Sequence, residues 1–153
     1  MAAAPPRPDA LAPAVRAFEA ADEAAVVALW QRCGLTRPWN DPGKDIRRKL
    51  AERRELFGVL TTPAGEVIGS VMAGYDGHRG WINCLAVCPH HQGQGHGRRL
   101  MAWAEARLRE AGCPKINLQV RQGNEQVLAF YAALGYTVDP VVSLGKRLEH
   151  DDR

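Results

Sequence analysis

The stretch Gln92-Gly93-Gln94-Gly95-His96-Gly97 decides how this chain folds, because of what stands on either side of it. It follows an apolar, strand-like run, Trp81 to Val87, and precedes an amphipathic helix expected to begin near Arg98. Glycines at alternate positions let the backbone turn tightly, and a helix start offers unpaired N–H groups and the positive end of a dipole. This order of strand, glycine loop and helix predicts a cradle, that is, a backbone binding site for an anionic diphosphate. The alternative is a glycine-rich turn that binds nothing.

Length and composition narrow the class of protein. The chain has 153 residues, of which 46% are hydrophobic and 24% charged, and its net charge is +3. We expect a flexible tail over residues 1–13, one domain over residues 14–148 and a C-terminal tail over residues 149–153. No run approaches the roughly 20 apolar residues that cross a bilayer, and the start lacks a secretion signal. A cytoplasmic protein with no membrane partner is expected.

The cysteines suit buried thiols in a reducing compartment better than a disulfide framework. They are scattered over different expected elements: Cys33, Cys84, Cys88 and Cys113. Cys84 and Cys88, with His90 and His91, suggest a zinc site, but four residues of strand span about 13 Å. Two thiolates that far apart cannot share one ion at bond lengths of about 2.3 Å. We expect neither a disulfide nor a metal.

Hydrophobic periodicity and turn residues predict the order of elements. Strands are expected at residues 15–18, 56–62, 66–75, 81–87 and 115–120, with one or two final strands over residues 136–147. Helices are expected from Asp22 to Gly34, from Asp41 to about Arg54, from near Arg98 to Gly112 and from Asn124 to Leu134. The order β-α-α-β-β-β-α-β-α-β predicts an α/β fold with a mixed sheet and helices on its faces.

Two other phosphate-binding motifs fail at particular positions. The dinucleotide fingerprint needs a third glycine where Arg98 stands, and an acidic residue about 20 positions later, where Asn117 and Gln119 stand. A P-loop ends in Gly-Lys-Ser/Thr, but the two Gly-Lys pairs of this chain are followed by Asp45 and Arg147. NAD and ATP are therefore disfavoured as ligands.

What remains is Gln-x-x-Gly-x-Gly, from Gln92 to Gly97, between a strand and a helix. With this motif the chain resembles the GNAT superfamily of N-acetyltransferases. The segment Asn124 to Tyr136, Asn-x5-Phe-Tyr-x3-Gly-Tyr, resembles the second signature of that family, and the element order over about residues 14–148 is similar to the family's order. Shorter stretches also resemble the small bacterial YpeA-type acetyltransferases, namely residues 37–42, 74–80, 112–115 and 143–148.

The resemblance implies acetyl-CoA as cosubstrate and names the residues that would hold it. Its pyrophosphate would lie on backbone amides of the loop, contributed by Gln92, Gly93, Gln94, Gly95, His96, Gly97 and Arg98. Gly95 and Gly97 would stay bare so that the ligand can approach, and Arg98 would add positive charge. Asn124 would contact the cofactor from the start of the last helix.

The resemblance also implies a β-bulge near Leu85, Ala86 and Val87. The bulge would splay this strand from the strand at residues 115–120, so that acetyl-CoA wedges between the two. It would leave N–H groups free to polarise the thioester carbonyl.

The candidates for proton transfer rest on two kinds of argument, the family resemblance and the position in the sequence. The resemblance implies that Tyr131 gives a proton to the departing thiolate, whereas an inward phenol at helical spacing is by itself typical of core. The general base stays open, because residues 81–87 hold no carboxylate where many relatives place a glutamate. Asp76 and His78 precede that strand and are candidates, directly or through water. Their alternatives are a turn-capping Asp and a solvated His.

How much the base matters depends on the acceptor. A lysine amine with a pKa of about 10.4 is rarely neutral at pH 7, whereas an α-amine near 7.8 is neutral roughly once in seven molecules. Trp39 and Asn40 border the acceptor side in similar proteins, where an aromatic wall would suit a cationic amine. Asp41 beside them has the alternative role of a helix cap.

These observations predict an N-acetyltransferase that moves the acetyl group of acetyl-CoA to a primary amine of a small molecule or protein, by direct attack in a ternary complex. A homodimer is compatible with the sequence. One alternative is a non-catalytic acyl-CoA-binding or regulatory module. Another is a basic nucleic-acid-binding module, but the basic residues 44–54 are interleaved with acidic ones, so no nucleic-acid partner is expected.

Overall fold

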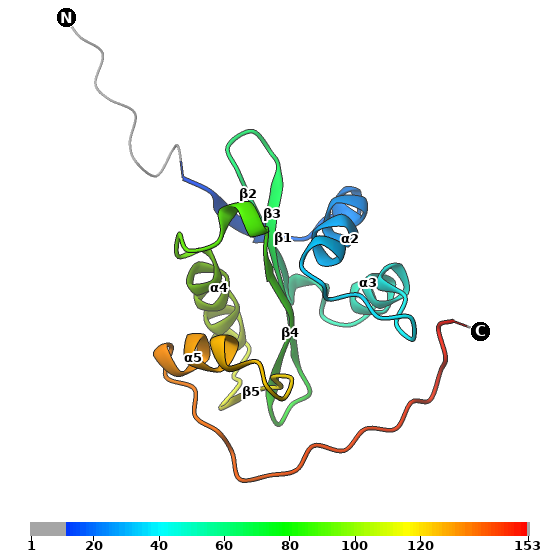
Figure 1. Cartoon of the computed structure of the whole chain (residues 1–153), viewed down its shortest axis with the longest axis vertical. Coiled ribbons are helices and arrows are strands. Elements are labelled where there is room, and N and C mark those ends of the chain that lie inside the picture. The colour runs from blue at the N-terminus through cyan, green and yellow to red at the C-terminus, as the bar shows by residue number, and fades with distance from the viewer. Residues whose placement is uncertain (1–11, 153) are drawn as a thin grey trace, which may run out of the picture.

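A computed structural model describes residues 12–152 and shows a central sheet covered on both faces by helices (Figure 1). Helices α2 and α3 lie on one face, and α4 and α5 on the other. The strands are β1 (Ala14–Ala17), β2 (Phe57–Thr61), β3 (Val67–Tyr75), β4 (Gly80–Val87) and β5 (Ile116–Leu118). The helices are α2 (Glu23–Arg32), α3 (Pro42–Leu50), α4 (His96–Glu110) and α5 (Glu125–Ala133). Short 3-10 turns are η1 (Ala20–Asp22), η2 (Arg54–Leu56) and η3 (Pro89–His91).

The sheet has the strand order β1-β2-β3-β4-β5, antiparallel except for the parallel pair β4 and β5. That last pair is short, because only Gly80–Ile82 pairs with Ile116–Leu118. Beyond Ile82 the two strands part. The predicted α/β class with a mixed, splayed sheet is therefore confirmed.

The core fills both faces of the sheet. On the α2 face, the ring of Phe57 stacks on Phe18 with centroids 4.4 Å apart and on Trp30 at 6.2 Å. On the other face, α4 buries four side chains at helical spacing: Leu100, Met101, Ala104 and Leu108. With both faces covered, β2 and β3 read as nearly continuous apolar runs. Within residues 12–152 no helix is long and apolar enough to cross a membrane.

The pairing of β3 with β4 slips by one residue at a β-bulge. Ser70 pairs with Ala86 and Met72 with Asn83, so Cys84 and Leu85 together stand opposite Val71. Cys84 adopts a left-handed backbone with φ of 51°, which is uncommon for a residue with a side chain. The bulge thus lies near the predicted residues 85–87 and begins one residue earlier, at Cys84.

Two hydrogen bonds hold the bulge, one of them buried and the other partly buried. The hydroxyl of Ser70 donates to the carbonyl of Cys84 at 2.9 Å, and the indole Nε1 of Trp30 donates to the same hydroxyl at 2.9 Å. Ser70 is completely buried. The carbonyl that the bulge takes out of the ladder is therefore satisfied by a side chain.

Some predicted boundaries are wrong in the structure. The second helix was expected to reach about Arg54 but ends at Leu50, because Arg53 turns into the left-handed region at φ 50°. Helix α4 begins at His96 instead of near Arg98, since the left-handed Gly95 already serves as its N-cap.

The expected final strands over residues 136–147 are also absent from the described part of the chain. The segment after α5 makes no ladder with a neighbouring strand, and Val138, Val141, Val142 and Leu144 are exposed. Side chains hold it instead: Lys115 and Asn117 both donate to Asp139, at 2.9 Å each. Figure 1 shows this segment running as an extended coil from α5 past the open side of the fold toward α3.

We expect Ser70→Ala to lower the free energy of unfolding by about 1–3 kcal/mol, because it leaves the Trp30 N–H and the Cys84 carbonyl without partners in the interior. Urea titration measures the loss. Thr62→Ala is the matched control, since the Thr62 hydroxyl accepts a hydrogen bond from Glu66 N in an exposed turn. Equal, small losses in both variants would contradict the role of Ser70 in holding the bulge.

Candidate functional site

The edge of β4 beyond Ile82 faces the gap left by β5. Leu85 sits in the bulge, and Ala86 and Val87 pair with β3 on the other side. Their outer backbone groups therefore have no strand partner within residues 12–152. One carbonyl is taken, because Val87 O accepts from Gln92 Nε2 at 3.1 Å and from Cys33 Sγ at 3.4 Å. Gln92 thus ties the glycine loop to the end of β4.

The loop that follows β4 has the backbone of an anion cradle. Gly93 and Gly95 take φ values of 76° and 82°, and a side chain added to either would meet nothing within 4 Å. The first intrahelical bond of α4 runs from Arg99 N to Gly95 O, so the amides of residues 96–98 precede the hydrogen-bond ladder of the helix. Open space, left-handed glycines and free amides together fit the predicted pyrophosphate site.

The charges at this helix start also favour an anion. Arg98 and Arg99 are exposed in the first turn of α4, which holds no acidic residue. Cations at a helix N-terminus oppose the helix dipole, whereas a bound anion would stabilise both the dipole and the arginines.

Gly97 and His96 each have a structural role at the start of α4. A side chain on Gly97 would come within 3.1 Å of the ring of Phe130, so this glycine allows α4 to pack closely against α5. Nε2 of the buried His96 lies 3.2 Å from Gln94 Oε1, and Nδ1 of the same ring is buried without a hydrogen-bond partner in the described part of the chain. Burial, with smaller effects of Arg99 and His91, lowers the pKa of His96 and favours the neutral ring.

Asn124 caps α5, and the helix places two tyrosines close together. The Asn124 side chain accepts from Val127 N at 3.3 Å. The ring of Tyr131 meets that of Tyr136 edge-on, with centroids 5.6 Å apart. The Tyr136 hydroxyl donates to Glu105 at 2.8 Å.

Tyr131 differs from Tyr136 in the hydrogen bonding of its hydroxyl group. It is 8% exposed, and its hydroxyl makes no hydrogen bond within residues 12–152. Burial raises the pKa of Tyr131 to about 12. The Tyr131 hydroxyl, without a hydrogen-bond partner in the described residues, is therefore free to donate to a ligand, whereas the Tyr136 hydroxyl already donates to Glu105.

The structure places Asp76 and His78 away from the bulge. Asp76 Oδ1 accepts from His78 N at 2.8 Å and from Arg79 N at 2.7 Å, and these bonds lower the pKa of Asp76. The strand from Gly80 to Cys84 spans about 13 Å, and the turn lies beyond its far end. This geometry favours the alternative in which Asp76 caps a turn and His78 is solvated.

On the α3 side, Asp41 caps the helix, because its Oδ1 accepts from Lys44 N at 3.0 Å. Arg147 reaches the two residues before it: Nη2 donates to Asn40 Oδ1 at 2.8 Å and Nη1 to the Trp39 carbonyl at 3.0 Å. The indole of Trp39 remains 44% exposed. The predicted acceptor residues Trp39 and Asn40 thus lie under the C-terminal segment.

That segment is anchored at Asp151, although residues 149–153 were expected to be a tail. Arg48 donates to Asp151 at 2.6 Å, and the Asp41 amide donates to the same carboxylate at 2.9 Å. This pairing raises the pKa of Arg48 and lowers that of Asp151. Nothing in the local sequence predicts these contacts, because they join positions more than 100 residues apart.

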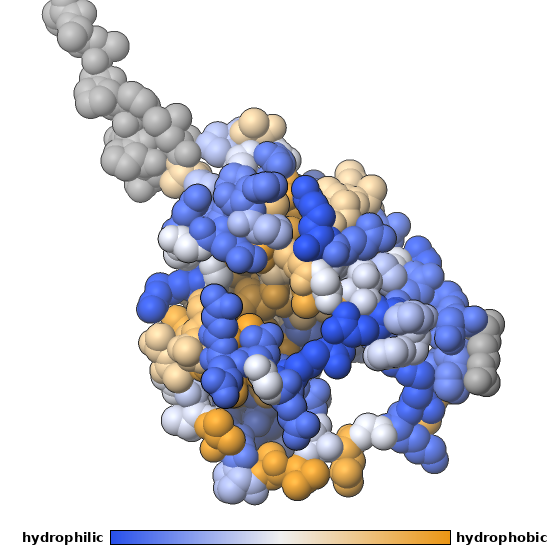
Figure 2. Space-filling model, viewed as in Figure 1, coloured by the Kyte–Doolittle hydropathy of each residue, from blue (hydrophilic) through white to orange (hydrophobic). Residues whose placement is uncertain are grey.

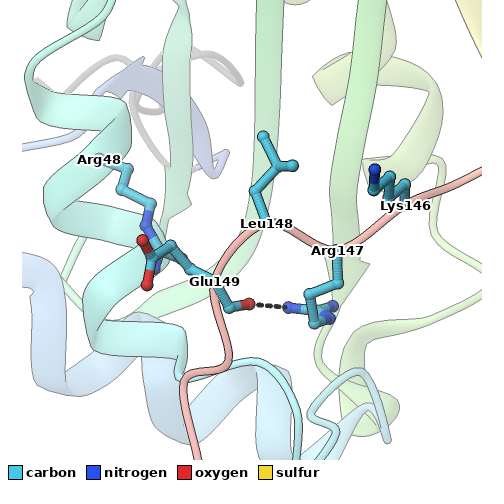
Figure 3. Close-up of a pocket in the computed structure, with 5 residues that line it drawn as sticks. All are labelled: Arg48, Lys146, Arg147, Leu148 and Glu149. Carbon is cyan, nitrogen blue, oxygen red and sulfur yellow. Dashed lines mark hydrogen bonds between the residues drawn. The ribbon is translucent and has the colours of Figure 1, made fainter.

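Between α3 and the C-terminal segment lies a cavity of about 330 Å³ (Figure 3). Its lining consists of Arg48, Lys146, Arg147, Leu148 and Glu149. Figure 2 shows an open gap between the body of the molecule and the C-terminal segment, which is hydrophobic along its lower part and hydrophilic toward its end. In the described residues no three His, Cys, Asp or Glu side chains gather as metal ligands.

Comparison with known proteins agrees with this geometry. Residues 18–136 match the model of the acetyltransferase (GNAT) family. An acetyltransferase of Sodalis glossinidius (strain morsitans) is 48% identical over 138 residues, which cover 90% of this chain and 96% of that protein. One from Pectobacterium atrosepticum is 46% identical over 137 residues, with coverage of 90% and 96%.

Solved structures share the fold. Ard1 from Thermoplasma volcanium superposes with a TM-score of 0.70 at 25% identity, covering 84% of each chain. The putative acetyltransferase yncA from Salmonella typhimurium, solved with its cofactor acetyl-CoA, gives 0.69 at 24% identity over 88% of each chain. The match extends over the cradle, the splayed strands and most of the sequence, so this chain belongs to the GNAT family of acetyltransferases and uses acetyl-CoA as its acetyl donor.

Proposed function

We propose that this enzyme acetylates a primary amine, of a small molecule or of a protein, by direct attack in a ternary complex. The observation that carries the proposal is the free edge of β4, which runs from the bulge at Cys84 to the cradle at residues 92–98. One ligand with a diphosphate at one end and an amide-rich arm would satisfy both the free amides of α4 and the unpaired edge. A cytoplasmic location and a homodimer stay predictions.

The chain supplies two kinds of contact for the donor. Backbone amides at the start of α4 would hold the pyrophosphate, with Arg98 adding charge, and N–H groups at Leu85 to Val87 would face the reacting carbonyl. When bound, acetyl-CoA supplies an activated thioester. Fixed donors at the bulge would stabilise the oxyanion that forms when an amine attacks that group.

Tyr131 is the residue we assign as general acid. Its hydroxyl has no partner in the described residues, and its pKa of about 12 keeps it protonated throughout the physiological range. It would donate its proton to the sulfur as the C–S bond breaks.

For the general base, Asp76 and His78 stay a sequence prediction that the geometry disfavours. Both lie beyond the far end of β4, and Asp76 already accepts two backbone N–H groups. An α-amine, neutral in roughly one molecule of seven at pH 7, would need little help, whereas a lysine-like acceptor would need a base nearer the bulge.

The cradle is tested by the melting temperature of the protein with and without acetyl-CoA, with NADH and ATP as comparison ligands. Acetyl-CoA at 100 times its dissociation constant should add about 2.7 kcal/mol to the stability of the wild type. Gly95→Glu should abolish that gain in stability, because it places a negatively charged carboxylate among the backbone amides that would bind the diphosphate.

Gly65→Glu is the matched control for this test. Gly65 also has a positive φ, 89°, with open space around it, but it lies in the turn between β2 and β3. Both variants should lose similar intrinsic stability, and only Gly95→Glu should lose the acetyl-CoA shift. An equal acetyl-CoA shift in the two variants would rule out the cradle.

Tyr131→Phe should lower kcat about 100-fold while the stabilisation by acetyl-CoA stays unchanged, because only proton donation is lost. Release of free thiol from acetyl-CoA, followed with a panel of primary amines, measures kcat. In the wild type, Tyr131 should cause no decline of kcat below about pH 10, since its pKa is about 12.

Tyr136→Phe is the companion variant, because it removes a hydroxyl that already donates a hydrogen bond to Glu105. It should cost stability and leave kcat within a few-fold of the wild type. If Tyr131→Phe keeps wild-type turnover, another group donates the proton.

A further inference from the structure

The C-terminal segment after α5 leaves its apolar side chains in solvent. Their exposed fractions are 83% at Val138, 75% at Val141, 85% at Val142, 92% at Leu144 and 85% at Leu148. Figure 2 shows hydrophobic residues along the lower part of this segment. Single exposed apolar residues are ordinary on a protein surface, whereas a group so close together in the chain marks an interaction surface.

The backbone of this segment is free as well. Figure 1 shows the segment as an extended coil, and from residue 137 to residue 148 it joins no strand of the described sheet. In the part of the chain that the structure describes, one amide of this stretch donates to a backbone carbonyl, namely Val141 N to Asp139 O at 2.9 Å. An extended stretch with unpaired N–H and C=O groups is a template for pairing with another strand.

The segment is tethered to the body of the molecule by polar side chains only. The tethers are Asp139, Ser143 and Arg147, which bond to side chains of Lys115 and Asn117, of Gln119 and of Asn40, respectively. Both bonds of Asp139 go to Oδ2, so Oδ1 accepts no hydrogen bond within residues 12–152. These tethers fix the course of the segment and leave its backbone and apolar side chains available to a partner.

The sequence of the segment is symmetric about Ser143. Val142 and Leu144 lie one position before and after it, and Val138 and Leu148 lie five positions before and after it. Two antiparallel copies paired at Ser143 would therefore place each of these apolar residues opposite another. A two-fold dimer needs such self-complementarity, because both copies offer the same surface.

Charge fits the same register. Asp139 and Arg147 lie four positions before and after Ser143, so the carboxylate of each copy would face the guanidinium of the other. The free Oδ1 of Asp139 can accept this second cation. The pairing is thus complementary in charge as well as in hydrophobicity.

Pro140 also fits, although it has no N–H to donate. Pairs in an antiparallel ladder alternate between hydrogen-bonded and non-hydrogen-bonded. If the two Ser143 residues form a hydrogen-bonded pair, Pro140 falls in a pair that needs no N–H. Val142 and Leu144 then fall in the non-hydrogen-bonded pairs, where side chains lie closest together. The amide of Val141 would exchange its bond to Asp139 for one to the partner.

The exposed apolar area is of the size that a stable dimer uses. An aliphatic side chain of this size exposes on the order of 100 Å² of apolar surface. The five side chains together therefore offer roughly 500 Å² per copy, against about 800 Å² per partner in a standard interface. The paired backbone adds to this area.

We propose that residues 138–148 form an antiparallel β-ribbon with the same residues of a second copy of this chain, about a two-fold axis at Ser143. The ribbon gives the predicted homodimer a specific interface. It is independent of the acetyl transfer, because neither the glycine cradle nor Tyr131 takes part in it.

Sedimentation equilibrium of the full chain tests the dimer. With rising concentration, the wild type should pass from the mass of one chain to that of two. Leu144→Asp should raise the dissociation constant at least 10-fold, because it places a carboxylate opposite Val142 of the partner copy. The Leu144 side chain is almost fully exposed, so the variant should fold and keep the acetyl-CoA shift of its melting temperature.

Leu35→Asp is the matched control for this test. Leu35 is also exposed, at 42%, but it follows α2 and lies outside the segment. This variant should dimerise like the wild type. A wild type that stays monomeric at every concentration, or a Leu144→Asp variant that associates as tightly as Leu35→Asp, would overturn the proposal.

A cross-link checks the register. Cα atoms in a hydrogen-bonded antiparallel pair are about 5.5 Å apart, within the range of a disulfide. Ser143→Cys should therefore link the two copies under mild oxidation, as seen by non-reducing gel electrophoresis and by mass spectrometry of the linked peptide. The wild type, oxidised in the same way, gives the baseline for the four native cysteines.

Gly145→Cys is the control for the cross-link. A side chain at Gly145 meets nothing within 4 Å, so the substitution is tolerated. Antiparallel pairing separates the two Gly145 positions by four residues, about 13 Å, which a disulfide cannot span. Equal linkage in the two variants, or no linkage in Ser143→Cys, would overturn the proposal.

Discussion

The bulge in β4 rests on one buried hydroxyl. Ser70 receives a hydrogen bond from Trp30 of α2 and gives one to the carbonyl of Cys84, each at 2.9 Å. A left-handed residue with a side chain costs on the order of 1–3 kcal/mol, and two hydrogen bonds at about 1 kcal/mol each offset that strain.

The free edge of β4 and the cradle are parts of one arrangement. Because β5 pairs with β4 only as far as Ile82, the outer edge of β4 has no strand partner within residues 12–152 from the bulge to Val87, whose carbonyl accepts from Gln92 and Cys33. Gln92 then fastens the loop to Val87, and the left-handed Gly95 starts α4 immediately afterward. The positive charges of Arg98 and Arg99 at that helix start are unfavourable until an anion is bound. An anion bound at this helix start would therefore relieve the unfavourable interaction between the arginines and the helix dipole.

Local signals predicted most of this fold, and long-range contacts account for most of what they missed. The glycine loop, the cap at Asp41 and the amphipathic character of α4 depend on residues a few positions apart, and each was predicted from sequence. The Ser70 contacts join positions 14 and 40 residues apart, so no local pattern indicates them. The prediction of final strands was wrong for the same reason, because long-range contacts decide the structure of that segment. Residues 136–147 have strand-like composition, but side-chain contacts with β5, rather than a ladder, hold them.

The roles of chemically equal residues depend on this long-range placement. Tyr131 and Tyr136 are neighbours, yet Glu105 engages one hydroxyl and leaves the other free. Asp76 and Asp45 are both aspartates, yet their surroundings differ. Two backbone N–H groups lower the pKa of Asp76 in the turn before β4, whereas burial raises the pKa of Asp45 on α3.

The two layers of helices flank the end of the β4–β5 pair from opposite sides. Helix α5, which carries Tyr131, lies on one face of the sheet, and α3 lies on the other (Figure 1). Because β5 pairs with β4 only as far as Ile82, the outer edge of β4 beyond that residue has no strand partner within residues 12–152. A ligand that pairs with this edge would therefore lie between the two helix layers, where neither a regular sheet nor a single helix could hold it.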